Sequence, residues 1–292
     1  MNLRYFIELL ILASLWGASF LFMRLAVDEL GPIWLIEFRI VFAVLCLLPI
    51  VLHLKLLTSL KQQAKTLLIV GTLNSALPFS LFAYATLTLT GGFTAILNAT
   101  TPLFGVLLVI LGCKENLSKA QIGGFLLGFA GVALLLGWQP VAVKAGFWLA
   151  VAAGLLGALM YALSAHYIKA KLSGVPAPAI ATGSMMGAAL TLLPLLPFTA
   201  PEHLPSLTAI LATIALGVLS TAMAYLIYFR LVRLIGPTRT LTVTYMIPMF
   251  AIFWGALLLH ESITPDMIIG CGIILAGTAM ANGLFSRWYK TE

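Results

Sequence analysis

Residues 102–131 read PLFGVLLVILGCKENLSKAQIGGFLLGFAG, and residues 248–277 read PMFAIFWGALLLHESITPDMIIGCGIILAG. The stretches lie 146 residues apart and share a proline, a glutamate, a hydroxyl residue and two glycines at identical intervals. Each lies in apolar sequence long enough to cross a bilayer. An internal repeat in a membrane protein is typical of a carrier built from two related halves. The matched residues are Pro102, Glu115, Ser118, Gly124 and Gly131 in the first stretch, and Pro248, Glu261, Thr264, Gly270 and Gly277 in the second.

The composition excludes a soluble domain. Hydrophobic residues make up 62% of the chain and charged residues 9%, with a mean hydropathy of +1.10, whereas about a quarter of the residues in soluble domains are charged. The apolar runs lack the alternation of barrel strands, and in hydrocarbon a helix satisfies its own backbone. We therefore predict an all-α integral membrane protein. Its cysteines, Cys46, Cys113 and Cys271, are scattered, so they predict apolar filling and neither a disulfide framework nor a metal site.

The apolar runs predict ten transmembrane helices. We keep the first as a membrane span and not a signal peptide, because its apolar run is too long and Arg24 follows it. The repeat divides the spans into two five-helix halves, residues 4–137 and 145–285. The predicted spans are 4–26, 33–53, 66–88, 93–112, 119–137, 145–167, 178–199, 207–229, 238–259 and 266–285.

Charge predicts the orientation of these spans in the membrane. With both termini in the cytoplasm, the outer connections hold only two basic residues, Arg24 and Lys144, together with Asp28, Glu29, Glu202, Glu261 and Asp266. This asymmetry follows the positive-inside rule and predicts a multi-pass protein of the plasma (inner) membrane. Because five is odd, the second half must insert upside down, as in an inverted repeat. The cytoplasmic set is Arg4, Lys55, Lys61, Lys65, Lys114, Lys119, Lys169, Lys171, Arg230, Arg233, Arg239, Arg287 and Lys290.

Glu115 and Glu261 stand between two spans, each three residues before a hydroxyl residue. Ser118 with Gln121 reads as a capping box, and Thr264 with Pro265 as an N-cap followed by proline. We interpret both glutamates as structural residues that tie down a helix end or a loop. The alternative makes one of them a proton or ion site.

Prolines interrupt three spans. Pro102 and Pro248 fall near the middle of the fourth and ninth spans, and Pro78 lies in the third. A proline inside a helix removes one backbone hydrogen bond and bends the helix. Finding two at matched positions favours functional bends that line a cavity or act as gate hinges over simple packing.

Polar and aromatic residues inside the spans are candidates to line a central cavity, because polar groups at this depth tend to face the bundle interior. Asn98 and Tyr245 are the stronger cases, since each precedes the bend proline of its half, and we expect them to lie close together. The other candidates are Trp16, Asn74, Tyr84, Tyr161 and Tyr225.

Arg39 is the only cation well inside a span, about 9 Å from the outer end at 1.5 Å per residue. Glu37 is two residues away, so the two side chains do not face each other on a helix. Arg39 either snorkels or forms a structural ion pair, or it binds a carboxylate on the substrate. Glu8 and Glu37 are the only acids within spans, so proton coupling would use one of them or His166.

Enzyme motifs are missing from the sequence. It contains no HExxH, no nucleotide-binding glycine loop, no serine elbow and no carboxylate pair at catalytic spacing. We expect no catalytic residues and no cofactor. The net charge of +7 is explained by membrane topology, so nucleic acid is not an expected partner.

Two segments carry a family resemblance. Trp16-Gly17-Ala18-Ser19-Phe20 with Arg39, and the stretch from Tyr225 to Glu261 with Gly236-Pro237-Thr238-Arg239, resemble the two repeats of the EamA family in the drug/metabolite transporter superfamily. The resemblance implies two inverted five-helix repeats around a central cavity, and export or exchange of small metabolites, amino acids among them. One departure is Leu156-Gly157 in the sixth span, where the first span has Trp16-Gly17.

The sequence therefore favours a secondary transporter that moves a small amphipathic metabolite by alternating access, with the lipid bilayer and the solute as partners and a coupling proton or ion left open. A membrane scaffold or accessory subunit is the alternative, although a full double repeat already supplies both halves of a cavity. An integral-membrane lipid enzyme would need a cluster of acids or histidines near one interface, and only scattered ones are present.

Overall fold

The computed structural model describes residues 3–112, 118–137 and 145–282, and in these parts of the chain every regular element is a helix. Seven helices are long and apolar enough to cross a membrane, and Ile247–Leu259 and Pro265–Ala281 are shorter apolar helices. The elements are α1 (Leu3–His53), α2 (Leu57–Gln62), α3 (Ala64–Gly71), η1 (Thr72–Ala76), α4 (Leu77–Thr86), α5 (Gly91–Asn98), α6 (Thr101–Gly112), α7 (Lys119–Gly137), α8 (Phe147–Lys171), α9 (Ala177–Leu192), η2 (Leu193–Phe198), α10 (Leu207–Gly217), η3 (Val218–Met223), α11 (Ala224–Ile235), α12 (Pro237–Thr240), η4 (Leu241–Tyr245), α13 (Ile247–Leu259) and α14 (Pro265–Ala281).

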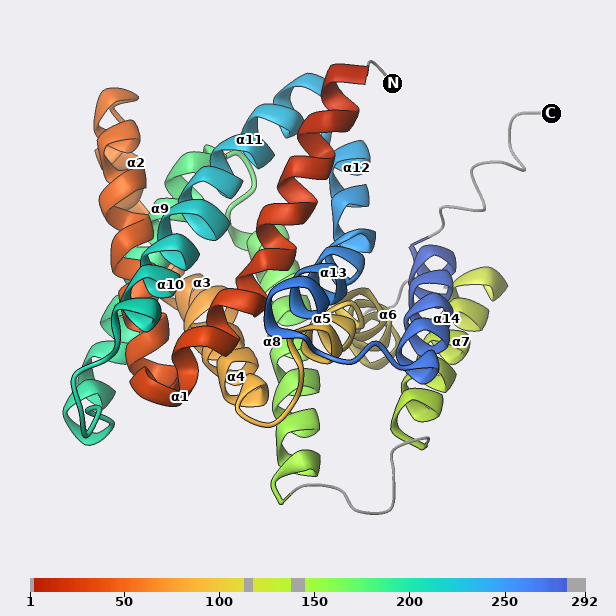
Figure 1. Cartoon of the computed structure of the whole chain (residues 1–292). Coiled ribbons are helices and arrows are strands. Elements are labelled where there is room, and N and C mark those ends of the chain that lie inside the picture. The colour runs from red at the N-terminus through yellow and green to blue at the C-terminus, as the bar shows by residue number, and fades with distance from the viewer. Residues whose placement is uncertain (1–2, 113–117, 138–144, 283–292) are drawn as a thin grey trace.

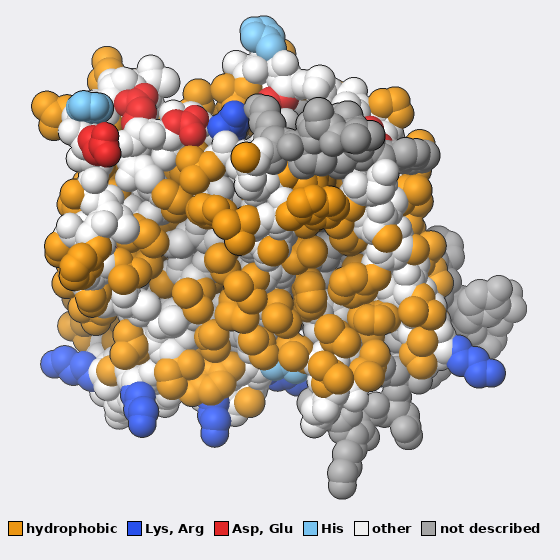
Figure 2. All heavy atoms as spheres, turned by 90° about the horizontal axis from the view of Figure 1, so that it is seen from below, with side chains coloured by type: hydrophobic (Ala, Val, Ile, Leu, Met, Phe, Trp, Pro, Cys, Tyr) orange, Lys and Arg blue, Asp and Glu red, His pale blue; other side chains and the backbone are white. Residues whose placement is uncertain are grey.

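The surface is that of an integral membrane protein. Large apolar side chains such as Leu45, Trp148 and Leu190 are more than half exposed. On the face shown in Figure 2, hydrophobic side chains form a broad band between a rim with acidic and histidine side chains and a rim with Lys and Arg. Apolar surface of this extent is stable only against lipid or another apolar partner.

Helix α1 contains two of the predicted spans, 4–26 and 33–53, without the connecting loop that the sequence suggests. The helix continues through Leu30 and breaks at Gly31, whose φ of 66° and ψ of 160° are not helical. Glycine adopts this backbone region without steric cost. A single residue therefore makes the bend near the middle of α1 (Figure 1).

The sequence repeat is also a repeat of local structure. Four pairs of elements begin 146 residues apart: η1 and η3, α5 and α12, α6 and α13, and α7 and α14. Both η1 and η3 are single π-helical turns inside longer helices, a rare feature that is frequent at functional sites. Similar local sequence therefore forms similar backbone in both halves.

Helices α7 and α14 pack along glycines and lie side by side (Figure 1). A Cβ placed on Gly124 would lie 2.6 Å from the Gly277 carbonyl oxygen, and one placed on Gly131 would lie 3.0 Å from the Ile274 nitrogen. As α7 advances, its contacts therefore move backward along α14, so the two helices are antiparallel. The small-residue face of Gly124 and Gly128 therefore serves close helix packing inside this chain.

In each half, one glycine also packs closely against a helix of the other half. Gly71 approaches the backbone of Ser184 and Ala188 in α9, and Gly217, 146 residues after Gly71, approaches that of Arg39 in α1. Each glycine stands directly before a π-helical turn and lets its helix touch the opposite half. These contacts fix how the helices with polar side chains are rotated.

Candidate functional site

Arg39 lies at the centre of a cluster of side chains from both halves. Its side chain is buried, and its Nε donates a hydrogen bond of 3.0 Å to the Thr221 Oγ1. The guanidinium carbon lies 3.6 Å from the centroid of the Phe79 ring, a cation–π contact. The snorkelling and ion-pair interpretations of Arg39 do not describe this arrangement, because within the described parts of the chain its partners are neutral.

The π-helical turn η3 prepares Thr221 for this contact. The Thr221 hydroxyl donates to the Leu216 carbonyl, five residues earlier, at 2.8 Å. Its proton is therefore occupied, and its oxygen is left to accept from Arg39. An ordinary helix turn presents the carbonyl four residues back, so the wider turn sets the direction of this hydroxyl.

Aromatic rings surround the arginine. Tyr161 stacks on Phe82 with ring centroids 5.8 Å apart, and Trp16 contacts Tyr225 at 6.4 Å. Trp16 also lies 5.5 Å from Tyr228. Offset or edge-to-face packing of this kind is favourable for rings at such distances. The cluster therefore presents a largely apolar wall beside one buried cation.

Five of the eight predicted cavity residues meet here. Tyr161 and Tyr225 lie within electrostatic range of Arg39, and the Asn74 side chain lies near the Tyr225 hydroxyl. Asn74 lies in η1, so both π-helical turns contribute to the cluster. The five are Trp16, Arg39, Asn74, Tyr161 and Tyr225, and we name them, with Phe79 and Thr221, the arginine cluster.

Phe79 and Thr221 were not singled out from the sequence. Phe79 is one of 17 phenylalanines and precedes Ser80 without any distinguishing motif. Thr221 carries one weak signal: it lies 146 residues after Ser75, which is in the other π-helical turn. The pairing with Arg39 could not be read from sequence, because it depends on that turn.

Tyr245, which we expected to lie close to Asn98, has another side-chain partner. The Tyr245 hydroxyl accepts a 2.7 Å hydrogen bond from the Asn282 side chain, and the Asn98 carbonyl accepts one of 2.7 Å from the Thr101 hydroxyl. Tyr84 is half-buried in α4. These residues are placed outside the hydrogen-bonded part of the arginine cluster.

The prolines mark where helices restart instead of bending one continuous helix. Pro102 and Pro248 are each the second residue of a helix, α6 and α13. The chain leaves the α-helix over Ala99 and Thr100 before α6, and the 3-10 segment η4 precedes α13. A proline is tolerated there because the first helical turn lacks backbone acceptors for its N–H groups. Pro78 differs from these two, because it is the second residue of α4 and the helix runs from η1 into α4 without a break.

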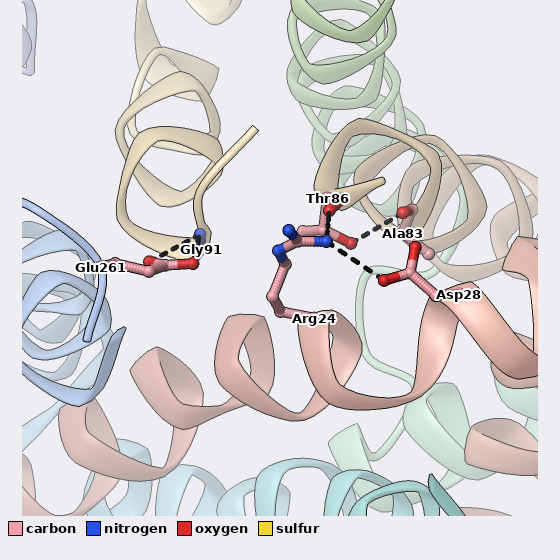
Figure 3. Close-up of polar contacts among 6 residues, drawn as sticks. All are labelled: Arg24, Asp28, Ala83, Thr86, Gly91 and Glu261. Atoms are coloured by element: carbon pink, nitrogen blue, oxygen red, sulfur yellow. Dashed lines mark hydrogen bonds and ion pairs between the residues drawn. The ribbon is translucent and has the colours of Figure 1, made fainter. Parts of the chain in front are cut away.

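Glu261 and Arg24 hold the turn between α4 and α5 from two sides (Figure 3). Both carboxylate oxygens of Glu261 accept from the Gly91 N–H at 3.1 Å, at the start of α5. Arg24 donates to the Thr86 carbonyl at 3.0 Å, at the end of α4. Each charge is favourable at its helix end, because N-termini attract anions and C-termini attract cations.

The other link residues show one difference from prediction. Ser118 and Gln121 form the expected capping box, with the Gln121 N–H donating to the Ser118 Oγ at 3.2 Å and the Ser118 N–H donating to the Gln121 Oε1 at 2.9 Å. Thr264 precedes α14, but its side chain makes no cap hydrogen bond. Pro265 fills the first position and needs no acceptor. Glu115 lies outside the described residues.

Neither acid within the spans forms a salt bridge with Arg39 in the described parts of the chain. Glu8 forms ion pairs with Arg4 at 3.4 Å and Arg230 at 3.2 Å. Glu37 is buried, and its Oε2 has no hydrogen-bond partner among the described residues. The His166 ring contacts the Ala162 carbonyl at 2.9 Å through Nδ1, which therefore donates. No ion pair joins Arg39 to an acid within the described ranges.

Glu29, in the exposed bend of α1, binds the first residue before α10. Its carboxylate accepts from the Ser206 N–H at 2.5 Å and from the Ser206 hydroxyl at 2.7 Å. These hydrogen bonds stabilise the charged form, the one to the backbone most, and lower the pKa of Glu29 below its usual 4.5. The contact therefore ties the α1 bend to α10 at neutral pH.

Comparison with known proteins identifies the family. The model of the EamA-like transporter family matches residues 4–137 and again residues 148–283. The chain belongs to the EamA-like transporter family. The match confirms the resemblance noted from Trp16-Gly17 and from the second repeat.

Similar proteins are named transporters. The chain is 23% identical over 276 residues to the uncharacterized transporter YoaV of Bacillus subtilis, covering 94% of each chain. It is 26% identical over 204 residues to a probable terminal-alkyne amino-acid exporter of Streptantibioticus cattleyicolor, covering 65% of this chain and 64% of that protein. A crystal structure with 18% identity covers 100% of both chains at a TM-score of 0.69, which supports the fold alone. Family membership and these names point to a role in transport and not in enzymatic catalysis.

Proposed function

We propose that this protein is a ten-helix secondary transporter of the plasma membrane that exports or exchanges a small metabolite by alternating access. The ten spans count the two arms of α1 separately and include the shorter helices α13 and α14. The cargo is an amino acid or a similar amphipathic solute. The observation that carries the proposal is the arginine cluster, where side chains from both halves converge on one buried cation.

The inverted repeat is supported by α7 and α14. They occupy equivalent places 146 residues apart, and their glycine contacts run in opposite directions. Equivalent helices that are antiparallel are what two upside-down copies would produce. The separation of acidic from basic side chains on opposite rims (Figure 2) supports cytoplasmic termini.

Alternating access requires places where helices can rearrange. The breaks before Pro102 and Pro248 and the π-helical turns η1 and η3 interrupt the α-helical ladder at matched positions in both halves. Interrupted helices at a repeat interface are typical of transporter binding sites. We assign Pro102 and Pro248 to helix restarts beside these hinges, Pro78 to the helix that continues after η1, and Glu261 to holding a turn.

Transport can be tested in proteoliposomes loaded with mixtures of amino acids and related metabolites. We expect saturable exchange that is absent from protein-free vesicles. Unchanged flux in both Asn98→Ala and Tyr245→Ala would remove those residues from the cavity, and unchanged flux in Trp16→Ala and Tyr161→Ala would remove the arginine cluster.

Topology can be tested independently with single cysteines introduced in the links after residues 112 and 259. An impermeant thiol reagent added outside should label only the link after residue 259. Labelling of both links from the same side would refute the inverted repeat and, with it, alternating access between equivalent halves.

A further inference from the structure

The charge balance of the arginine cluster specifies the class of cargo more narrowly than the family does. We propose that the site selects a monocarboxylate with an apolar, preferably aromatic, body and without a free amine. This inference rests on the proposed function and deepens it. It narrows the proposed cargo from amino acids and similar amphipathic solutes to those without an amine, because an amino acid brings a cationic ammonium group to the same site.

Arg39 is a buried cation for which the described residues supply no anionic partner. It is 5% exposed, and its partners within the described residues are a hydroxyl and a ring face. Removing a charge from water is costly unless an opposite charge or several hydrogen bonds compensate it. A hydroxyl and an aromatic ring compensate only in part. An anion from solution would complete the site.

The geometry of the guanidinium favours a carboxylate. Arginine carries five N–H donors, and the described residues engage only the Nε, through Thr221. The four donors on the two terminal nitrogens remain for a ligand, and their planar fork matches the two oxygens of a carboxylate. Thr221 fixes the fork by holding the nitrogen at its base.

An ammonium group finds no anionic partner among the described members of the cluster. Glu8 pairs with Arg4 and Arg230. Glu37 forms no ion pair with Arg39 among the described residues and lies two positions away on the same helix, where side chains do not face each other. The remaining members are neutral, and the nearest charge is Arg39 itself, which would repel a second cation. A zwitterion therefore binds less well than the corresponding acid.

The aromatic rings near Arg39 determine which kind of ligand body the site favours. The rings form two sets of contacts: Trp16 packs with Tyr225 and Tyr228, and Tyr161 packs with Phe79 and Phe82. Rings pack well on a flat apolar ligand, and their edges and faces are less suited to a polyhydroxylated solute. A carboxylate at the fork would place such a body against these rings.

Three probes with one phenylethyl body separate the charge classes: 3-phenylpropanoate carries only the carboxylate, L-phenylalanine carries both charges, and phenethylamine carries only the ammonium. Binding to the full-length protein in detergent at pH 7.5 is measured by tryptophan fluorescence. We expect 3-phenylpropanoate to bind at least about tenfold more tightly than L-phenylalanine, and phenethylamine to bind least. Equal or tighter binding of either amine, or no binding of the acid, would overturn the inference.

Substitution of the arginine links this order to the site. Arg39→Gln should weaken binding of 3-phenylpropanoate by about 10- to 100-fold, as loss of a charge-assisted hydrogen bond predicts, and should abolish the preference over L-phenylalanine. Arg233→Gln, which removes an exposed arginine in α11, is the matched control and should change neither value. If Arg39→Gln does not fold, Arg39→Lys keeps the charge without the fork and should bind the acid less tightly than wild type.

Counterflow in proteoliposomes separates this inference from the proposed function. Exchange of amino acids that is the same in wild type and Arg39→Lys would leave the transporter in place and refute the selection of carboxylates. No exchange of acids, amino acids or amines above protein-free vesicles would refute both. Exchange of 3-phenylpropanoate by wild type that falls in Arg39→Lys and not in Arg233→Gln supports both.

Discussion

Replacing Gly277 by alanine tests the close packing of α7 against α14. A Cβ at this position would lie 2.6 Å from the Gly128 Cα and 2.7 Å from the Gly124 carbonyl oxygen, where ordinary contacts are 3.4–4 Å. All these neighbours are backbone atoms, so no side chain can rotate away. The two helices would have to separate by ~1 Å, and overpacking of this kind costs about 1–3 kcal/mol.

Gly272 in the same helix is the matched control, because a Cβ there meets nothing within 4 Å. In a helix, alanine is favoured over glycine by roughly 0.5–1 kcal/mol, so Gly272→Ala should be neutral or slightly stabilising. Thermal unfolding in detergent, followed by reaction of the buried Cys271 with a fluorescent thiol probe, should show Tm lowered by roughly 2–10 °C only in Gly277→Ala. If Gly277→Ala melts at or above the wild-type temperature, the antiparallel glycine contact is not as described.

Three further predictions concern polar contacts. Glu261→Ala should lower the unfolding free energy by about 1–3 kcal/mol because the Gly91 N–H loses its acceptor. Glu202→Ala, at an exposed site, is the control and should leave the unfolding free energy unchanged. Equal effects of the two substitutions in denaturant melts would argue against the Glu261–Gly91 contact. Gly255→Ala should act like Glu261→Ala, since its Cβ would collide with the Glu261 carboxylate, and a Tm equal to wild type would contradict this. Glu29→Gln should lower Tm at pH 7, and this difference in Tm should shrink as pH falls below about 4.5. The reason is that a carboxylate with a lowered pKa stabilises the fold above its unfolded pKa and loses that contribution as it protonates. A difference in Tm that is independent of pH from 7 to 3 would contradict the Glu29–Ser206 contact.

Several features of the candidate site could be named from sequence because they are rare in a membrane. Arg39 is conspicuous as a lone cation inside a span, and the aromatic residues Trp16, Tyr161 and Tyr225 lie at comparable depth. Whether these side chains meet could not be predicted, since the depth of a residue along a helix does not give its rotation about the helix axis. Thr221 illustrates this: the π-helical turn that directs its hydroxyl to Arg39 leaves no composition signal.

Contacts between the two halves could not be predicted from the sequence either. The repeat pointed to Glu261 as a residue at a helix link, but its partner Gly91 lies 170 residues away. Asn98 and Tyr245 were paired by their distance from the prolines. In the structure the Tyr245 hydroxyl instead accepts a hydrogen bond from the Asn282 side chain, a contact that distance along the sequence does not predict.

The sequence by itself determined that the chain lies in lipid and is helical, because hydrocarbon requires long apolar helices. It also determined the doubled architecture, because a repeat of 146 residues preserves its spacing. The tertiary structure decided which polar groups meet. Close glycine contacts at Gly71, Gly217 and Gly277 set the rotation and separation of the helices. The π-helical turns then directed the side chains of Asn74 and Thr221 into the arginine cluster. Rotation and register are properties of packed pairs of helices, so no single span contains them.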